Sequence, residues 1–545
     1  MSIYNKADYP FLYNTATALY EKSRNDNLRD FPLSVREEFH KTGIRQNFEK
    51  LYFKRRDYLS SAAVLALFDD SYINELEKII VGICEEALWA LPAHTVGNKA
   101  DDRGVIDLFV AETSFALAEI CTVFADKISL QVCNKVKAEI RTRLLENNKV
   151  NTFWWEKCNM NWASVCAAYT AGTFLYLFPQ EFEKQKKRIL KTLEAYIDGF
   201  TQDGFCPEGP SYWQYGFFAY SVFADLLKKI SEGKTDLFAD EKVRRVASFS
   251  SICMLKGNTS LSFSDSQRDF QPDFALMKHL SAGLNGCVPY AETDIPYFWD
   301  ANTKWMNYYR AIIWDTGTEI AEKETPYIFF SENADVLIVN KSEYSFAFKA
   351  GNNDEPHNHN DLGSFIYSDK DGQVFCDLGA GRYTKDYFDD EKRYDVFCNS
   401  SFSHSVPIIN RKGQSAGKEY KARLSFEKST AICDLSKAYC LNGLTCFIRK
   451  ADLKENGVLI TDKFVFGGSL PVTERFVSLR KAEIKKGVLI FASTKMFFSE
   501  ENVSLSVKEE KHTPHEYDTE DITVYCYDFT LKTGVNEIAF EIITE

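Results

Sequence analysis

The sequence predicts a multidomain α+β protein, with an all-helical domain over residues 1–325 followed by a β-sandwich over residues 326–545. Length is the first observation, because 545 residues exceed one ordinary hydrophobic core. Up to roughly residue 320, apolar residues recur at three- and four-residue spacing, which is typical of helices. Beyond Thr325-Pro326 the apolar runs become short, partly alternating and rich in β-branched and aromatic residues, which is typical of strands.

The first part is expected to contain serial helices joined by short loops that carry Gly, Pro, Asn and Asp. Helices are expected at 58–70, 73–91, 105–128, 182–200, 215–230 and 242–255. This arrangement indicates stacked antiparallel helix pairs, forming either an open solenoid or a closed toroid. The sequence contains no fixed-length repeat, so periodicity alone leaves both arrangements open.

The second part is expected to contain many short strands separated by turn signals such as Asn456-Gly457. Strands are expected at 334–340, 344–351, 364–368, 373–379, 457–468 and 522–534. Short strands at this spacing predict a β-sandwich. The domain boundary is expected at 318–330, a polar stretch that contains Pro326.

Charge and composition restrict the possible partners. Lys and Arg number 65 against 78 Asp and Glu, a net charge of −13, which argues against general nucleic-acid binding. An anionic substrate would therefore need a locally basic site. Aromatic residues make up 14% of the chain, enough to line a sugar cleft. No apolar run approaches the length needed to span a bilayer, so we expect no membrane partner.

The cysteines and the first residues bear on compartment. Fourteen cysteines are scattered without a CxxC pair, and we expect reduced core thiols. The first residues, MSIYNKADYPFLYN, have no charged n-region followed by an unbroken apolar core, so they do not read as a secretory signal. We expect a cytoplasmic protein, or a periplasmic or secreted one if an export signal has been removed. The sequence predicts no oligomeric state.

Histidine is scarce, and two of the eight histidines form the run Pro356-His357-Asn358-His359 directly after a predicted strand. Residues two apart in a strand face the same side, so His357 and His359 are expected to converge. Asp377 and His404 follow in the next segments. Two imidazoles and a carboxylate suit a Zn²⁺ site. The alternative is that these are turn residues with local hydrogen bonds.

The segment DGFCPEGPSYWQYG (203–216) combines a rigid Gly- and Pro-rich loop with the start of a helix. That helix carries Tyr212 and Tyr215, and Glu208 lies four residues before Tyr212. A nearby cation can lower the pKa of a phenol and make it a better base. The alternative is that these rings only pack at the start of the helix.

Two further segments carry candidate binding residues. In CNMNWASVCAAYTAG (158–172), Asn159, Asn161 and Trp162 precede or begin an apolar helix. Neutral amides can hydrogen-bond a substrate carboxylate without the cost of burying a fixed charge. The alternative for Asn159 is a helix N-cap.

The segment GAGRYTKDYFDDEKRY (379–394) brings Arg382, Tyr383 and Arg393 close in sequence to the two histidines. Arg382 and Tyr383 follow two glycines, so a binding loop is one interpretation of this segment. A solvated loop is the alternative, because neighbouring acidic residues nearly cancel the positive charge.

Taken in order, these segments resemble the heparinase II/III-like polysaccharide lyases, a family that includes heparin and heparan sulfate lyases and related alginate lyases. The resemblance is carried by MNWASVC, DGFCPEGPSYWQYG, HNHNDLGSF with GAGRYT, and NSSFSHSVP. It implies an N-terminal (α/α) toroid followed by a C-terminal antiparallel β-sandwich. Trp162 stands where some members have a histidine, and the sequence leaves syn or anti stereochemistry open.

The resemblance also implies roles for single residues. Asn161 resembles the residue that neutralises the uronate carboxylate, Tyr212 the tyrosine that acts as Brønsted acid or base, and His357 the histidine that shares this work. Tyr383 resembles a second tyrosine that contacts substrate. We expect the other polar and aromatic residues of these segments to bind substrate as well: Asn159, Trp162, Glu208, Tyr215, Arg382 and Arg393. The ligands of one structural divalent metal, usually zinc, are matched by His359, Asp377 and His404.

The implied function is cleavage of a uronic-acid-containing glycan or oligosaccharide by β-elimination, which leaves a 4,5-unsaturated uronate end. A glycosaminoglycan is favoured over alginate, and the partner is an anionic uronate glycan. One alternative is a glycoside hydrolase on an (α/α) toroid, for which Asp203 and Glu208 are the attractive carboxylate pair. A non-catalytic carbohydrate-binding protein is another. A cupin-like metal enzyme matches only the opening of the histidine pattern.

Overall fold

A computed structural model describes residues 3–25, 27–95, 103–268, 270–283, 304–315, 327–355, 357–389, 391–515 and 520–545. The chain divides into two compact units. The first comprises Met1–Phe200, Gln214–Ala247 and Pro272–Ala321, and the second comprises Thr201–Trp213, Ser248–Gln271 and Glu322–Glu545. The expected domain boundary between residues 325 and 326 lies outside the described residues.

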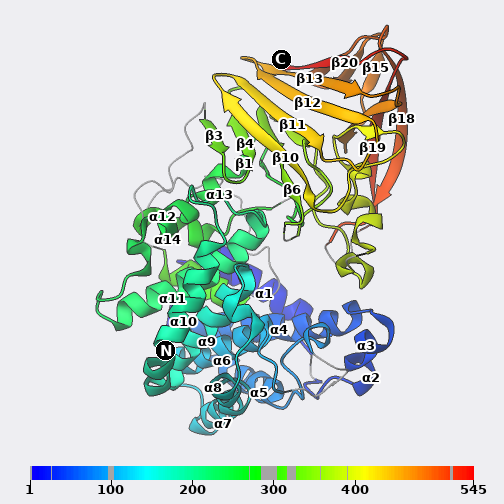
Figure 1. The fold of residues 1–545 in the computed structure, drawn as a ribbon. Helices are drawn as coiled ribbons and strands as arrows, with labels where there is room; N and C mark the ends of the chain where they lie inside the picture. The colour runs from blue at the N-terminus through cyan, green and yellow to red at the C-terminus, as the bar shows by residue number, and fades with distance from the viewer. Residues whose placement is uncertain are drawn as a thin grey trace. The chain divides into compact units, whose positions relative to one another are not determined.

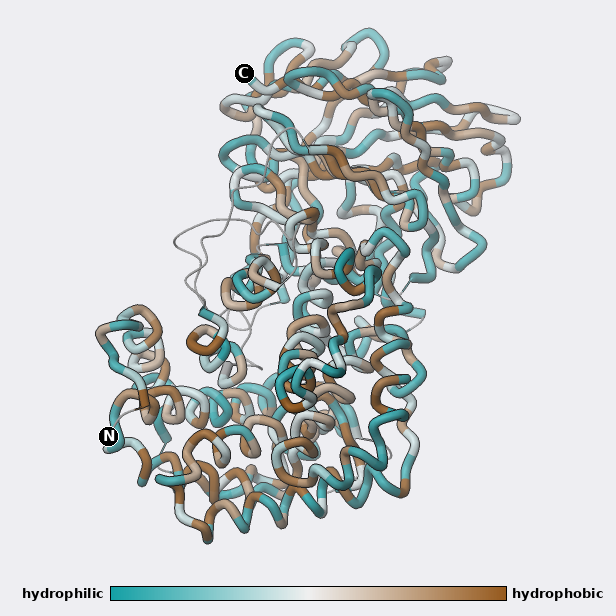
Figure 2. The backbone as a smooth tube through the Cα atoms, turned by 90° about the vertical axis from the view of Figure 1, so that its left-hand side faces the viewer, coloured by the Kyte–Doolittle hydropathy of each residue, from teal (hydrophilic) through white to brown (hydrophobic). Residues whose placement is uncertain are grey.

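The first unit is built from consecutive helices that pack in pairs (Figure 1). In each pair, a helix buried on nearly all sides precedes a helix buried along one stripe. The buried members are α4 (Gln46–Phe68), α6 (Leu108–Val123) and α9 (Asn161–Leu177), and their partners are α5 (Ile73–Cys84), α7 (Leu130–Ile140) and α10 (Pro179–Asp198). Figure 2 shows hydrophobic and hydrophilic residues alternating along the helices. A helix that is apolar all round must be enclosed, whereas an amphipathic helix covers it from outside. The sequence of pairs therefore makes an inner and an outer layer of helices.

The remaining helices complete this unit. Among the described residues they are α1 (Pro10–Ser23), α2 (Leu33–Arg36), α3 (Glu38–Thr42), α8 (Glu146–Val150), α12 (Glu241–Ala247), α14 (Phe274–Gly283) and α15 (Lys304–Ile313), together with α11 (Pro210–Ile230) from Gln214 onward; the first turn of α11 belongs to the second unit. The inner helices α6 and α9 approach closely at Gly172, where an added Cβ would lie 2.5 Å from Cε2 of Phe115. A side chain at this position would therefore force the two helices apart.

The predicted single helix at 242–255 is wrong, because the structure divides this stretch. After α12 come the short helix α13 (Phe249–Ile252) and the strand β1 (Met254–Leu255), which pairs with β2 (Thr259–Ser260) across a turn. Gly257 in that turn has φ of +66°, in the left-handed region that ends helices and that glycine adopts without strain.

Within the described ranges, the second unit contains three antiparallel sheets besides the β1–β2 pair. The five-stranded sheet has the order β3 (Tyr327–Ser331), β4 (Val336–Asn340), β5 (Ser345–Lys349), β7 (Phe365–Asp369), β8 (Gly372–Phe375). The four-stranded sheet has the order β18 (Val503–His512), β19 (Ile522–Leu531), β14 (Val472–Ser478), β9 (Ile408–Ile409). The nine-stranded sheet has the order β15 (Glu483–Lys485), β16 (Val488–Phe491), β17 (Thr494–Phe497), β20 (Glu537–Thr544), β13 (Gly457–Phe466), β12 (Leu444–Leu453), β11 (Thr430–Lys437), β10 (Gly417–Glu427), β6 (Gly351–Asn353).

One aromatic core joins the three sheets. The ring of Phe476 on β14 lies 5.4 Å from that of Phe375, which ends β8, and 4.7 Å from that of Phe540 on β20. In the nine-stranded sheet, buried and exposed residues alternate along β11 and β20, as expected for strands that cover a core with one face. The predicted sandwich is therefore present.

The five-stranded sheet is buried on both faces along β4, β5 and β7. The segment Ser248–Gln271 bonds to it and to the strand ends, although it is interposed between helices of the first unit in the sequence. The Lys256 amide donates to Oγ of Ser345, and Oγ of Ser262 donates to the Asp377 carbonyl. These bonds bring the turn at Ser264 and Asp265 into the sandwich unit.

Two further features concern the described residues. None of their helices combines the length and apolar character that a membrane crossing requires. The thirteen cysteines within the described ranges are all free.

Candidate active site

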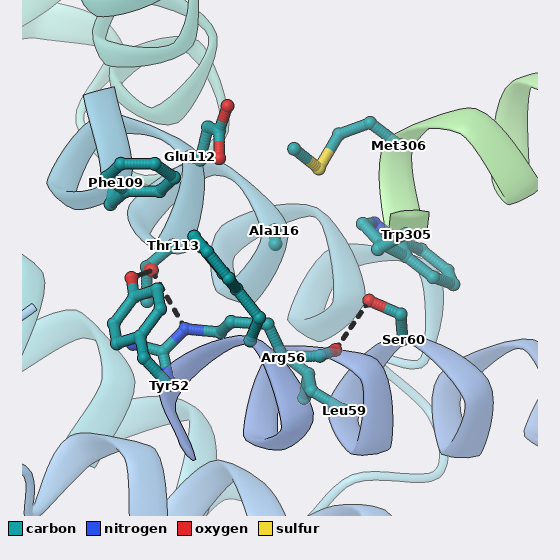
Figure 3. A pocket seen from close by; sticks show the side chains of 11 residues that line it. Tyr52, Arg56, Leu59, Ser60, Phe109, Glu112, Thr113, Ala116, Trp305 and Met306 are labelled. Atoms are coloured by element: carbon teal, nitrogen blue, oxygen red, sulfur yellow. Dashed lines mark hydrogen bonds between the residues drawn. The ribbon is translucent and has the colours of Figure 1, made fainter. Parts of the chain in front are cut away.

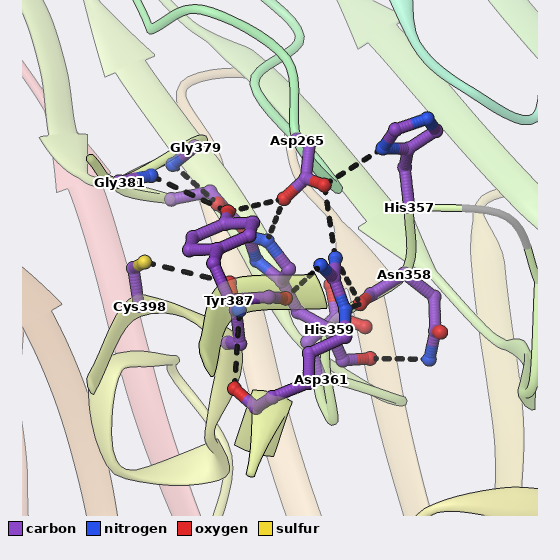
Figure 4. A network of polar contacts seen from close by, with 12 residues as sticks. Asp265, His357, Asn358, His359, Asp361, Gly379, Gly381, Tyr387 and Cys398 are labelled. Atoms are coloured by element: carbon purple, nitrogen blue, oxygen red, sulfur yellow. Dashed lines mark hydrogen bonds and ion pairs between the residues drawn. The ribbon is translucent and has the colours of Figure 1, made fainter. Parts of the chain in front are cut away.

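His357 and His359 lie in the turn that follows β6. The expectation that strand geometry aligns them is wrong, because this stretch is not a strand and His357 has φ of +60°. Both rings nevertheless reach one carboxylate, that of Asp265 (Figure 4). Nδ1 of His357 lies 2.8 Å from Oδ2 of Asp265, and Nε2 of His359 lies 3.0 Å from Oδ1. The turn thus achieves the convergence that the spacing predicted, by another geometry.

Asp265 is the buried centre of this network. Oδ1 also accepts a hydrogen bond from the Tyr387 hydroxyl, and Oδ2 lies 2.9 Å from Nη2 of Arg393. Burial alone would raise the pKa of this carboxyl. The hydrogen bonds from both histidines and the positive charge of Arg393 outweigh burial and hold the pKa of Asp265 well below its ordinary value. The carboxylate therefore stays ionised.

Tyr212 stacks on His357 within the same unit. It lies in the first turn of α11, directly after Gly209. Gly209 has φ of +92°, and an added Cβ would lie 2.0 Å from Oγ of Ser266, so glycine lets this loop contact the turn that carries Asp265. The Tyr212 and His357 ring centroids are 4.3 Å apart, with an interplanar angle of 25°.

A second phenol lies against the first. The hydroxyls of Tyr212 and Tyr383 are 2.5 Å apart, and the Tyr383 ring lies 4.1 Å from that of His515. Burial raises the pKa of Tyr212 above its ordinary value, and the negative charge of Asp265 raises it further. The Tyr383 hydrogen bond opposes these effects without cancelling them. Tyr212 therefore carries its proton at neutral pH, whereas the sequence suggested that a cation would lower its pKa.

His357 remains half-buried, with Nε2 lying 3.7 Å from Oε1 of the buried Glu208. Burial lowers the pKa of His357, but its hydrogen bond to Asp265 and the charges of Asp265 and Glu208 outweigh burial and raise it. The partly exposed His357 imidazole therefore has the Tyr212 phenol and the Asp265 and Glu208 carboxylates as neighbours. Such a set can both take up and release protons.

The predicted metal ligands His359, Asp377 and His404 also converge. All three side chains are fully buried, and their candidate ligand atoms lie within 4.8 Å of one another. They come from three loops: the turn after β6, the segment after β8, and the segment before β9. Among the described residues, Nδ1 of His359, Nδ1 of His404 and Oδ2 of Asp377 have no hydrogen-bond partner, although the last two atoms are 3.1 Å apart.

The second ring nitrogen of His404 and the second carboxylate oxygen of Asp377 form hydrogen bonds. The atoms of these two residues that could bind a metal are therefore the ones without a hydrogen bond. Nε2 of His404 lies 3.0 Å from the Cys398 carbonyl, so it must be the donor, and Nδ1 keeps its lone pair. Oδ1 of Asp377 accepts from the Gly379 amide at 2.9 Å. Buried, unsatisfied N, N and O atoms backed by outer hydrogen bonds fit a divalent metal site.

The other predicted residues of this unit differ in what they contact. Arg393 donates to Asp265 and to the carbonyls of Asn358 and Tyr387, so it braces the turn. The half-buried Arg382 guanidinium forms neither a hydrogen bond nor an ion pair with any described residue.

The other four predicted site residues belong to the helical unit. Asn161 is the first residue of α9 and is 2% exposed, and Met160 occupies the N-cap position, so the N-cap alternative for Asn159 is wrong. The Asn159 carbonyl lies against Gly199, where an added Cβ would approach its oxygen to 2.0 Å. The Trp162 ring lies 4.9 Å from that of His94.

Tyr215 donates a 2.6 Å hydrogen bond to Oε1 of Glu112, inside the helical unit. Glu112 lines a cavity of about 20 Å³ (Figure 3). Arg56 and Trp305 are among the other residues that line it. This volume holds about one water molecule, so the cavity itself is too small for a sugar ring.

Asp265 and Tyr387 are the residues that the sequence did not single out. Asp265 lies in a loop 92 residues before His357, and no local spacing connects the two. Tyr387 lies in the segment 379–394, but no feature of the sequence distinguishes it from Tyr383 as a candidate site residue. Only the tertiary bonds of the segment Ser248–Gln271 reveal the connection.

Comparisons with known proteins bear on the whole chain. Neither a family model nor a curated protein matches the sequence. Solved structures do match. Heparinase III superposes with a TM-score of 0.63 at 13% identity over 99% of this chain and 90% of that chain. Heparan sulfate lyase HepC from Pedobacter heparinus gives 0.58 at 12% identity over 98% and 88%. Streptomyces coelicolor A3 chondroitin AC lyase gives 0.57 at 10% identity over 99% and 80%.

These matches show the fold. The chain has the heparinase II/III-like polysaccharide lyase fold, with a helical toroid followed by an antiparallel β-sandwich, and this prediction from the sequence is confirmed.

Proposed function

We propose that this chain is a polysaccharide or oligosaccharide lyase that cleaves uronic-acid-containing glycans by β-elimination and leaves a 4,5-unsaturated uronate end. The observation that carries the proposal is the stacked pair of Tyr212 and His357, with ring centroids 4.3 Å apart and the histidine bonded to Asp265. A glycosaminoglycan is the favoured substrate class, because the similar structures include lyases named for heparan sulfate and chondroitin.

The chemistry requires three tasks. The C5 proton of a uronate is barely acidic while the carboxylate keeps its charge, so the enolate that forms must be stabilised. A base must take the C5 proton, and an acid must protonate the departing O4. No water is consumed, because the C4–O4 bond breaks as the C4–C5 double bond forms.

The residues of this chain can share these tasks. Tyr212 keeps its proton at neutral pH, which suits the acid that protonates O4. His357, held by Asp265, suits the base that takes the C5 proton. Asn161 is the proposed partner of the substrate carboxylate, from its match to the family motif. Arg382 and Tyr383 are proposed to bind the glycan.

Zinc is the proposed metal, bound by His359, Asp377 and His404. Two imidazoles and one carboxylate are a donor set that Zn²⁺ favours. When bound, zinc would act as a structural cross-link. The three ligands come from three loops, so the residues themselves would hold the turn with His357 against the neighbouring segments.

The test is a screen of uronate polysaccharides and their oligomers, followed by ultraviolet absorbance of the new double bond. The expected result is absorbance growth with at least one substrate, and its loss in His357→Ala. A glycoside hydrolase would release reducing ends without this absorbance, and a carbohydrate-binding protein would bind without releasing them. The hydrolase alternative gains no support from the structure, because Asp203 bonds to Thr201 and to the Phe205 amide within its own turn.

A further inference from the structure

We propose that Asp265 is a positioning residue that sets opposite tautomers on two histidines, leaving Nε2 of His357 open to substrate and Nδ1 of His359 open to a metal ion. The inference rests on the proposed function for the role of His357. It adds a residue that connects the proton-transfer site to the metal site.

Both carboxylate oxygens of Asp265 face donors: Tyr387 donates to Oδ1, and Nη2 of Arg393 lies 2.9 Å from Oδ2, so both oxygens act as acceptors. Nδ1 of His357 lies 2.8 Å from Oδ2, so it must carry the hydrogen. A neutral His357 ring then has its lone pair on Nε2, the nitrogen turned toward Glu208. This is the tautomer that a base facing the substrate needs.

The second histidine presents its opposite nitrogen to the same carboxylate. Nε2 of His359 lies 3.0 Å from Oδ1, so it too must be the donor. Its lone pair is therefore on Nδ1, the atom that lies buried and without a hydrogen-bond partner among the described residues beside Asp377 and His404. One carboxylate thus prepares both nitrogens.

The carboxylate is itself held in place. Its side chain is fully buried, Tyr387 donates to Oδ1, and Nη2 of Arg393 lies 2.9 Å from Oδ2. Every one of these neighbours is a donor. An amide at position 265 would present an acceptor on one side and a donor on the other.

Because the amide has one donor and one acceptor, Asp265→Asn is expected to lose the correct tautomer of one of the two histidines. If the amide NH₂ faces His357, Nδ1 must accept and the ring hydrogen moves to Nε2, so the base is lost. If the NH₂ faces His359, the hydrogen moves to Nδ1 and the metal ligand is lost. Either orientation damages one of the two sites while preserving the size of the side chain.

The experiment compares zinc-loaded wild-type protein with Asp265→Asn and with the control Asp369→Asn. Asp369 is also fully buried and paired with an arginine, Arg480, at 3.0 Å, but it contacts neither histidine. Zinc affinity is measured by chelator competition, and kcat and KM on the substrate found in the screen. Asp265→Asn should lower kcat or zinc affinity by about 10- to 100-fold, with KM little changed. Asp369→Asn should change melting temperature alone.

Wild-type kcat and zinc affinity in a folded Asp265→Asn protein would overturn the inference. If the wild type eliminates no uronate glycan, the proposed function fails, and the zinc affinities still decide the role of Asp265. If Asp265→Asn does not fold, a crystal structure of the zinc-loaded wild type decides it. The inference requires Nδ1 of His359 on the metal, and Nε2 on the metal would contradict it.

Discussion

At the scale of single residues, Tyr212 shows how environment assigns a role. Burial and the charge of Asp265 raise the pKa of its hydroxyl, and the short contact to Tyr383 keeps a second phenol beside it. A phenol whose pKa is raised cannot supply a resident phenolate, but it can donate its proton to a leaving oxygen. Tyr212 is therefore better suited to the acid step than to the base step.

Tyr212→Phe should lower kcat by about 10²- to 10⁴-fold, because it removes the proton donor together with its hydrogen bond to Tyr383. The ring and its stacking on His357 are retained, so the melting temperature should change little. Tyr344→Phe is the matched control, since its hydroxyl donates to the carbonyl of Lys454, in the turn between β12 and β13. Turnover of Tyr212→Phe at the wild-type rate would rule out this role.

At the scale of elements, the site depends on loops that enter from different strands and helices. The start of α11 reaches the turn of Asp265 at Gly209, and the metal triad joins three loops that leave β6, leave β8 and enter β9. Few of these contacts are local in sequence. A single substitution in one of these loops is therefore expected to disturb the site more than a substitution within a helix or strand.

Gly209→Ala should destabilise the protein by about 1–2 kcal/mol, because alanine is strained at positive φ. It should also lower kcat, because its Cβ would displace Ser266 beside Asp265. Gly233→Ala is the control, with φ of +79° and no atom within 4 Å of an added Cβ. Chemical denaturation and steady-state kinetics should show a stability loss in both variants, larger in Gly209→Ala because of the clash with Ser266, and a kinetic loss in Gly209→Ala alone. Equal kinetics in the two variants would contradict the account.

His404→Ala should abolish bound zinc and lower the melting temperature, because it removes one ligand and leaves the Asp377 carboxylate buried without its neighbour. Metal analysis and thermal unfolding with and without chelator measure both effects. His279→Ala is the control, a half-buried histidine stacked on Trp314 at 4.2 Å in the helical unit. It should lower stability and keep the zinc content. Full zinc occupancy in His404→Ala would refute the assignment.

At the scale of the whole molecule, buried titratable groups make stability depend on pH. Burial raises the pKa of Asp273, which accepts hydrogen bonds at the start of α14, to about 6. Since the unfolded value is about 3.9, its contribution to stability is full below pH 3.9 and is lost as the pH rises through about 6. A shift of about two units corresponds to about 3 kcal/mol.

Asp273→Asn should therefore become more stable relative to wild type as the pH rises from about 4 to about 7, since the variant has no charge to bury. Thermal unfolding of both proteins across this range measures the difference. A difference in melting temperature that is independent of pH would show that Asp273 does not titrate in this way.

The fold was predictable because its signals are local. Helical periodicity predicted the helices of the first unit, strand alternation predicted the sheets of the second, and the order of short motifs indicated the lyase fold. His359, Asp377 and His404 could be grouped from residue type and motif, and the structure brings them together. The roles assigned to Asn161, Tyr212 and His357 stay predictions.

Asp265 could not be predicted, because its partners are 92 to 128 residues away in the sequence. The turn geometry of His357 escaped as well, since positive φ at histidine has no signature in the spacing. Both depend on how the segment Ser248–Gln271 bonds to the sandwich.

The most direct measurement of the central claim is mass spectrometry of products formed from a uronate oligosaccharide in heavy-oxygen water. Elimination predicts that the product masses add up to the substrate mass, that one product carries a C4–C5 double bond, and that no heavy oxygen enters the new end. Incorporation of one heavy oxygen at the cleaved bond would show hydrolysis and contradict the account.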